Sequence, residues 1–86
     1  MKHKVFSVYD SKVEAYHVPF FAPTVGAAIR MFADAVGDSG SQFAKHAEDY
    51  TLFLIGEYDD QHARLEPVAA LQSLGCALEF VKTGGV

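Results

Sequence analysis

The sequence has little positive charge for its length. Its 86 residues include 7 Lys and Arg against 11 Asp and Glu, which gives a formal net charge of −4 at pH 7. Proteins that coat nucleic acid by neutralising phosphates are usually basic, so the composition excludes a polycation of that kind. The charge is unevenly divided, with five basic against four acidic residues in 1–45 and two against seven in 46–86. Contacts to phosphate are therefore expected from the N-terminal half.

Cysteine and long apolar runs are also scarce. Cys76 is the single cysteine, which excludes an intrachain disulfide and fits a reducing compartment. No apolar run approaches the roughly 18 residues of a membrane span. No apolar segment follows the basic start "MKHK", so a signal peptide is not expected. These absences predict a cytoplasmic protein with no membrane contact.

The sequence offers no metal site with recognisable spacing. A zinc site needs about four converging nitrogen or sulfur ligands. The histidines that could serve are His3, His17, His46 and His62. They are scattered, and the groups "HAED" (46–49) and "DDQH" (59–62) are interpreted as charged turn segments. No metal or other cofactor is predicted.

Patterns of catalytic residues are missing as well. The sequence contains no phosphate loop, no dinucleotide-binding glycine pattern and no nucleophile elbow. Cys76 lies in the apolar segment "SLGCA" without a neighbouring base, which is typical of a core cysteine. We expect a binding protein and no enzyme, and predict no catalytic residue.

What the sequence does contain is apolar and aromatic material for one small core. Hydrophobic residues make up 50% of the chain and aromatic residues 13%, which predicts a single globular domain over 1–86. A chain of this size buries only about 60–65% of its unfolded surface. Small domains without disulfides are often stabilised by dimerisation, and we expect a homodimer here.

The N-terminal part predicts a β-hairpin followed by a helix. Residues 4–10 ("KVFSVYD") are rich in β-formers, 10–12 have turn chemistry, and 13–21 ("VEAYHVPFF") alternate as a second strand. Pro19 places that second strand at a sheet edge. A helix is predicted over 24–36, with Thr24 as its N-cap and an apolar stripe on one side.

Gly37 is the expected C-terminal stop of this helix. A single helical turn can form within 43–49, and 50–58 ("YTLFLIGEY") predicts a central strand. The turn at 59–62 then leads into a short return strand, 63–67. Periodicity leaves 68–81 open between helix and strand. Residues 82–86 predict a frayed tail, disordered over 83–86.

Together the elements predict an α+β fold. A small antiparallel sheet in the order ββαββ, plus a C-terminal element, would pack one main amphipathic helix on one face.

Aromatic residues near lysines form the candidate binding set. Alternating aromatic residues are more often core than surface, yet rings with a few cations can also hold single-stranded nucleic acid by stacking. In the extended pair Phe20–Phe21, one ring should lie off the core. The candidate DNA-binding residues are Lys2, Lys4, Lys12, Arg30, Tyr9, Tyr16 and Phe21.

Several longer stretches are similar to a known family. They are "KVFSVYDSK", "PFFAPT", "AAIRMFADAV", "FAKHAEDYTLF", "GEYDD" and "SLGCALEF", spread from about residue 2 to residue 82. In these stretches the chain resembles the small non-structural protein of the gokushovirus group of microviruses, which are single-stranded DNA phages. It departs from the family pattern at 37–39, often Asn-Asp-Pro there, and at Ala47, often proline.

The resemblance implies a role in phage genome replication, in the host cytoplasm. The family is placed there as a DNA-binding factor, or as the factor that switches synthesis from duplex to packaged single strands. We therefore expect a non-structural DNA-binding accessory that prefers single strands. The alternative is a protein–protein adaptor that recruits the phage initiator, a capsid precursor or a host replication factor without touching DNA.

Overall fold

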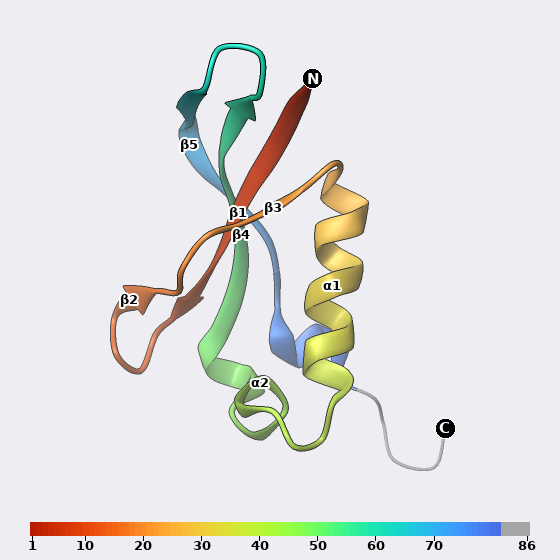
Figure 1. Cartoon of the computed structure of the whole chain (residues 1–86). Coiled ribbons are helices and arrows are strands. Elements are labelled where there is room, and N and C mark those ends of the chain that lie inside the picture. The colour runs from red at the N-terminus through yellow and green to blue at the C-terminus, as the bar shows by residue number, and fades with distance from the viewer. Residues whose placement is uncertain (82–86) are drawn as a thin grey trace.

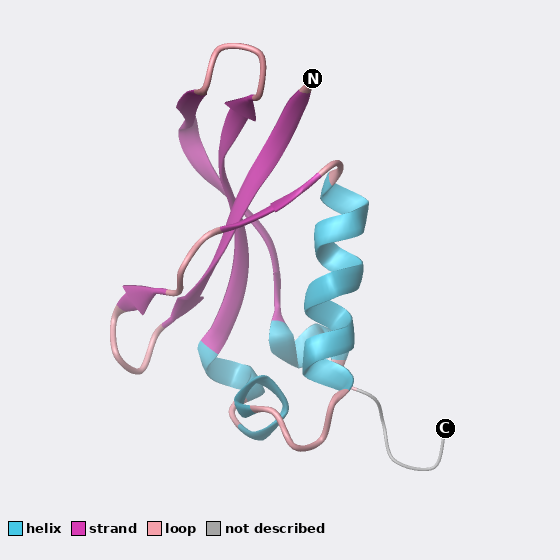
Figure 2. Cartoon of the chain, viewed as in Figure 1, coloured by secondary structure: helices cyan, strands magenta, loops and turns pink. Residues whose placement is uncertain are grey.

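Five strands form one antiparallel sheet in the computed structural model of the chain, which describes residues 1–81 (Figures 1 and 2). The strands are β1 (Lys2–Asp10), β2 (Ala15–Tyr16), β3 (Phe20–Ala22), β4 (Tyr50–Asp59) and β5 (Arg64–Cys76). Their order is β2-β1-β4-β5, and β3 also pairs with β1. One main helix accompanies the sheet, so the predicted α+β arrangement is confirmed, as is the central position of the strand predicted over 50–58.

The second strand of the predicted hairpin is broken, so a continuous strand over 13–21 was wrong. β2 pairs with the end of β1, with Tyr9 opposite Tyr16, whereas β3 pairs nearer its start, with Phe6 opposite Phe20. Between them Pro19 has no backbone donor for a ladder. The backbone N–H of His17 still donates to the Val8 carbonyl at 2.8 Å, and the Ser7 hydroxyl donates to the His17 carbonyl at 2.6 Å, so these two bonds hold the segment to β1.

The main helix, α1 (Val25–Gly37), begins where the sequence predicts. The backbone N–H of Ala27 donates to the Thr24 hydroxyl at 3.0 Å, which confirms the N-cap. The predicted stop at Gly37 is one residue early. Gly37 remains helical, and the chain leaves the helix at Asp38, whose N–H still donates to the Ala35 carbonyl.

The C-terminal half contains a longer strand than predicted. The short turn α2 (Gln42–Lys45) and a 3-10 turn, η1 (Ala47–Asp49), fill the region predicted as one helical turn. β5 then continues to Cys76 and is followed by a second 3-10 turn, η2 (Ala77–Phe80), so a return strand ending at 67 was wrong. Two register shifts against β4 interrupt its alternation, which is why periodicity left 68–81 open. The predicted tail, 82–86, lies outside the described residues.

The core lies between one face of the sheet and α1. Phe6, Val8 and Leu52 from the central strands are buried against Phe32 and Val36 of the helix. Figure 1 shows α1 beside the sheet, with the start of β1 and the β4–β5 hairpin extending past the end of the helix. Because α1 lies on one side, no helix within residues 1–81 covers the opposite face of the sheet.

Tyr50, at the start of β4, is expected to make the fold less stable at alkaline pH. Burial, followed by the nearby charges of Asp10 and Asp49, raises the pKa of its hydroxyl above the ordinary value near 10. The folded state therefore favours the neutral phenol, whose stabilising contribution is present below about pH 10 and is lost as pH rises through the raised pKa. Denaturation followed between neutral and strongly alkaline pH should show Tyr50→Phe losing less stability than the natural chain. Identical alkaline losses in both proteins would contradict this.

Asp59, in the β4–β5 turn, is expected to titrate at unusually low pH. The hydrogen bond from His62 Nδ1, at 2.8 Å, is the main cause that lowers the pKa of this carboxyl, and the Gln61 N–H at 2.9 Å adds to it. Because the pKa of Asp59 is lower in the folded state, its ionised carboxylate stabilises the turn at pH values above the ordinary pKa. This stabilisation is lost as the pH falls through the folded pKa. In an NMR titration His62→Ala should raise the Asp59 pKa towards about 3.9. His46→Ala is the matched control and should leave it unchanged.

Candidate nucleic-acid interface

The uncovered face of the sheet is set by alternation along β1. Phe6 and Val8 point towards α1, so the intervening Val5, Ser7 and Tyr9 point to the opposite side. Residues that are directly paired across strands lie on the same side. Phe53, opposite Ser7, and Tyr16, opposite Tyr9, therefore share this face.

Aromatic rings gather on this face in two clusters. At one end Tyr16 contacts Tyr9 and Phe53, with ring centroids 4.7 and 5.7 Å apart. At the other end Phe21 and Tyr58 have centroids 5.7 Å apart. We call these five residues, Tyr9, Tyr16, Phe21, Phe53 and Tyr58, the ring face. The separations are those of packed aromatic pairs, yet 46% of Tyr16 and 52% of Phe21 remain exposed.

His3 extends the second cluster. Its ring centroid lies 6.3 Å from that of Tyr58, and its Nε2 lies 2.9 Å from a carboxylate oxygen of Asp60. The contact with Asp60 holds the imidazole beside the tyrosine. Protonated, it is the one basic side chain of β1 on the ring-face side.

An apolar groove runs from Tyr16, in the first cluster, to Val5, which pairs with Phe21 of the second. It consists of two hollows of about 370 and 280 Å³ that share Pro19 and Ile55. Leu71 borders one hollow and Leu65 the other, and these side chains are 50% and 65% exposed. A contiguous apolar surface of this kind marks a binding site more often than a free surface.

Gly56 is required where this groove crosses β4. A Cβ atom at this position would lie 2.7 Å from the carbonyl oxygen of Glu66 in β5. No side chain fits without moving one of the two strands. The glycine therefore lets β5 approach β4 closely on this side of the sheet.

The structure brings the predicted rings together but not the predicted cations. Lys2 and Lys4 alternate with the ring-face positions of β1 and so point to the side that α1 occupies. Lys2 also lies 3.7 Å from Glu57. Lys12 lies in the turn between Tyr9 and Tyr16, at one end of the ring face, whereas Arg30 is exposed on α1. Lys12 lines a hollow with Asp10 and Tyr50, on the side of the sheet that α1 occupies, so none of the four is shown against the rings within residues 1–81.

Two members of the ring face, Phe53 and Tyr58, were missed by sequence reasoning. They are five positions apart on β4, so strict alternation would place them on opposite sides. The register shift between Leu54 and Gly56 inserts Ile55, which returns Tyr58 to the side of Phe53. The apolar character of both sides of 50–58 was visible, but the bulge was not.

Within the part of the chain that the structure describes, one acidic cluster comes close enough to hold an ion. Ligand atoms of His46, Glu48 and Asp49 lie within 4.8 Å of one another around η1. His46 and Glu48 are exposed, and this set lacks the fourth protein ligand of a closed structural site.

Among residues 1–81, no helix has the length and apolarity needed to cross a membrane.

Comparison with known proteins gives two matches. The profile of the family described as "Phage ORF5 protein" matches residues 3–80. "Protein ORF5" of Chlamydia phage 1 is 38% identical over 69 residues, which cover 76% of this chain and 72% of that protein. No solved structure matches.

Proposed function

This chain belongs to the Phage ORF5 protein family, as a small protein of microvirus-type phages, and from this premise we propose that it binds single-stranded DNA through the ring face. It would act in the host cytoplasm as an accessory of genome replication or of the switch to packaging. The proposed role is binding, with no catalytic step.

The observation that carries the proposal is the half-exposed pair Tyr16 and Phe21, each in contact with a second ring. A ring held in place by a neighbouring ring loses little freedom when a base stacks on it. Stacking contributes about 1–3 kcal/mol per base and tolerates any sequence, because every base has a π-face.

The spacing of the two clusters sets the length of strand required. Tyr16 is opposite Tyr9 and Phe21 is opposite Val5, four positions apart on β1, or about 13 Å. Bases in a stacked strand are about 3.4 Å apart. A strand along β1 must therefore be several nucleotides long to reach both clusters.

Few phosphates can be neutralised in such a complex. The basic side chains offered to such a strand are His3, beside Tyr58, and Lys12, in the β1–β2 turn. Two neutralised phosphates on a single strand give a slope of about −1.4 in log affinity against log salt concentration. We therefore expect weak salt dependence and a marked dependence on strand length.

Fluorescence anisotropy with labelled oligothymidines of increasing length, and with a duplex, tests this at several salt concentrations. Affinity should rise until the strand reaches both clusters, should exceed that for the duplex, and should change little with salt. Absence of binding at low salt would overturn the proposal. So would equal affinity for the duplex with a steep salt slope, because that result describes binding to phosphate alone.

A second candidate function is favoured by the charge of the same surface. The five rings and the apolar groove carry no Lys or Arg side chain within the part of the chain that the structure describes. A partner protein would fit this surface without cations. Nuclease-resistant co-purification with the phage initiator, lost on substitution of Tyr16 and Phe21, would support the adaptor and count against DNA binding.

A further inference from the structure

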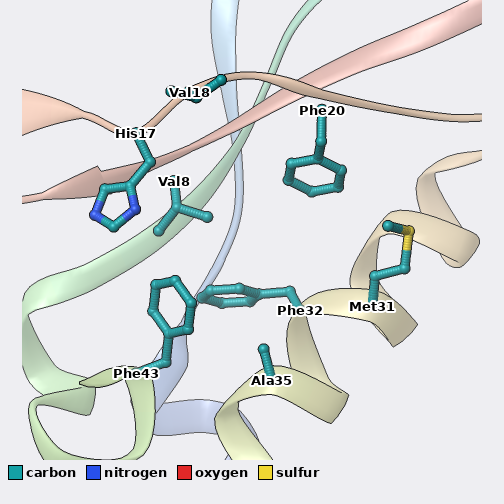
Figure 3. A pocket seen from close by; sticks show the side chains of 8 residues that line it. All are labelled: Val8, His17, Val18, Phe20, Met31, Phe32, Ala35 and Phe43. Atoms are coloured by element: carbon teal, nitrogen blue, oxygen red, sulfur yellow. The ribbon is translucent and has the colours of Figure 1, made fainter. Parts of the chain in front are cut away.

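A second apolar surface lies on the helix side of the molecule. Eight side chains line a hollow of about 210 Å³ between α1, α2 and the segment that joins β2 to β3 (Figure 3). Phe32 and Phe43 lie side by side at one side of it, Phe20 points in from the start of β3, and His17, on the joining segment, supplies the one labelled ring with nitrogen atoms. We call this hollow the helix groove.

The rim of the helix groove projects into solvent. Val18, on the β2–β3 segment, is 87% exposed, and Met31, on α1, is 50% exposed. A β-branched side chain that is almost wholly in water gains nothing from the fold of its own subunit. Val18 protrudes beside the apolar hollow, so a protrusion and a recess lie on the same side of the molecule. A surface of this form can be complementary to itself.

Charged residues beside Met31 are also arranged so that the surface is complementary to a second copy of itself. Arg30 and Asp34 are one turn apart on α1 and both are exposed. Neither takes part in an ion pair among residues 1–81. When two copies of α1 pack antiparallel with Met31 at the contact and the twofold axis level with residue 32, Arg30 of each copy faces Asp34 of the other. Two identical surfaces then carry complementary charges, as a symmetric dimer requires.

We infer that the helix groove is filled by a second copy of this chain, with α1 packed antiparallel on the partner's α1. Val18 of each copy enters the groove of the other, and Arg30 pairs with the partner's Asp34 at both ends of the contact. The charge pattern favours a second copy over an unrelated protein, because a twofold rotation places each Arg30 opposite an Asp34. The ring faces of both copies stay open, so dimerisation and DNA binding are separate properties.

Sedimentation equilibrium from micromolar to millimolar concentration tests the dimer. The natural chain should be dimeric at the upper end. Arg30→Glu should weaken association at least about 10-fold, since it places like charges together twice. The double variant Arg30→Glu/Asp34→Arg should restore it, and Met31→Asp should abolish it. Lys45→Glu, a charge reversal on α2, is the matched control and should have no effect.

Circular dichroism on the same variants separates interface effects from folding, because the charge pair also lies at i,i+4 spacing within one helix. A monomer at every concentration would overturn the inference. So would failure of the charge swap to restore the dimer while helix content is unchanged. A dimer abolished by alanine at Tyr16 and Phe21, but not by Met31→Asp, would place the contact on the ring face and overturn it too. DNA affinity is measured separately, so either proposal can fail alone.

Discussion

Alanine at both Tyr16 and Phe21 is expected to weaken binding of single-stranded DNA by at least about 30-fold. Each ring is the exposed member of its cluster, and removal of one stacked base is equivalent to about 1–3 kcal/mol. Two such losses on one strand give a reduction of about 30-fold to more than 10³-fold. Anisotropy with an oligothymidine long enough to reach both clusters measures it.

Single variants make this result specific. Tyr16→Ala and Phe21→Ala should each reduce the affinity for the long strand. A strand too short to span the groove contacts one cluster at a time, so its affinity should not show the combined loss of both substitutions. Leu78→Ala removes an exposed apolar side chain, 59% accessible, from η2, and is the matched control. Unchanged affinity in the double variant, with the fold intact by circular dichroism, would refute stacking on the ring face.

Phe6→Ala is expected to remove about 3–5 kcal/mol of stability. Phe6 is fully buried in the centre of β1, and its ring packs 5.6 Å from that of Phe20. The substitution leaves a cavity in the layer between the sheet and α1. Domains are stable by only about 5–15 kcal/mol, and one of 86 residues lies near the lower limit. Most of the free energy of unfolding should therefore be lost.

Urea denaturation followed by circular dichroism measures the effect on stability. Val13→Ala, at a side chain that is 66% exposed in the β1–β2 turn, is the matched control and should change the free energy of unfolding by no more than about 0.5 kcal/mol. Equal midpoints for the two variants would show that Phe6 does not hold the core.

Prediction from the sequence succeeds where structure depends on neighbouring residues. Thr24 caps α1 because its hydroxyl reaches an amide three residues ahead. The apolar stripe of the helix is buried as its spacing predicts, with Phe32 and Val36 in the core. Tyr9 lies on the side of β1 opposite to Phe6 and Val8, as alternation along 4–10 predicts. Alternation continued over 13–21 would place Tyr16 with Phe20 and away from Phe21, and this was wrong.

Prediction fails where structure depends on pairing between distant strands. The break at Pro19, the length of β5 and the bulge at Ile55 each depend on which residue faces which across a ladder. Single-sequence periodicity contains no such information. The same limit hid Phe53 and Tyr58, whose common side is set by that bulge. For the same reason the sequence grouped Lys4 and Arg30 with the rings, although the fold places these two side chains on the other side of the sheet.

The sequence by itself determined an acidic, disulfide-free chain, its capped helix, its aromatic hairpin and its family. Those properties depend on composition and on contacts within a few residues along the chain. Only the tertiary structure decided that rings from β1, β2, β3 and β4 share one open face while most of the basic side chains point elsewhere. The reason is that each strand presents alternate residues to opposite sides, and the register between strands selects which of them meet.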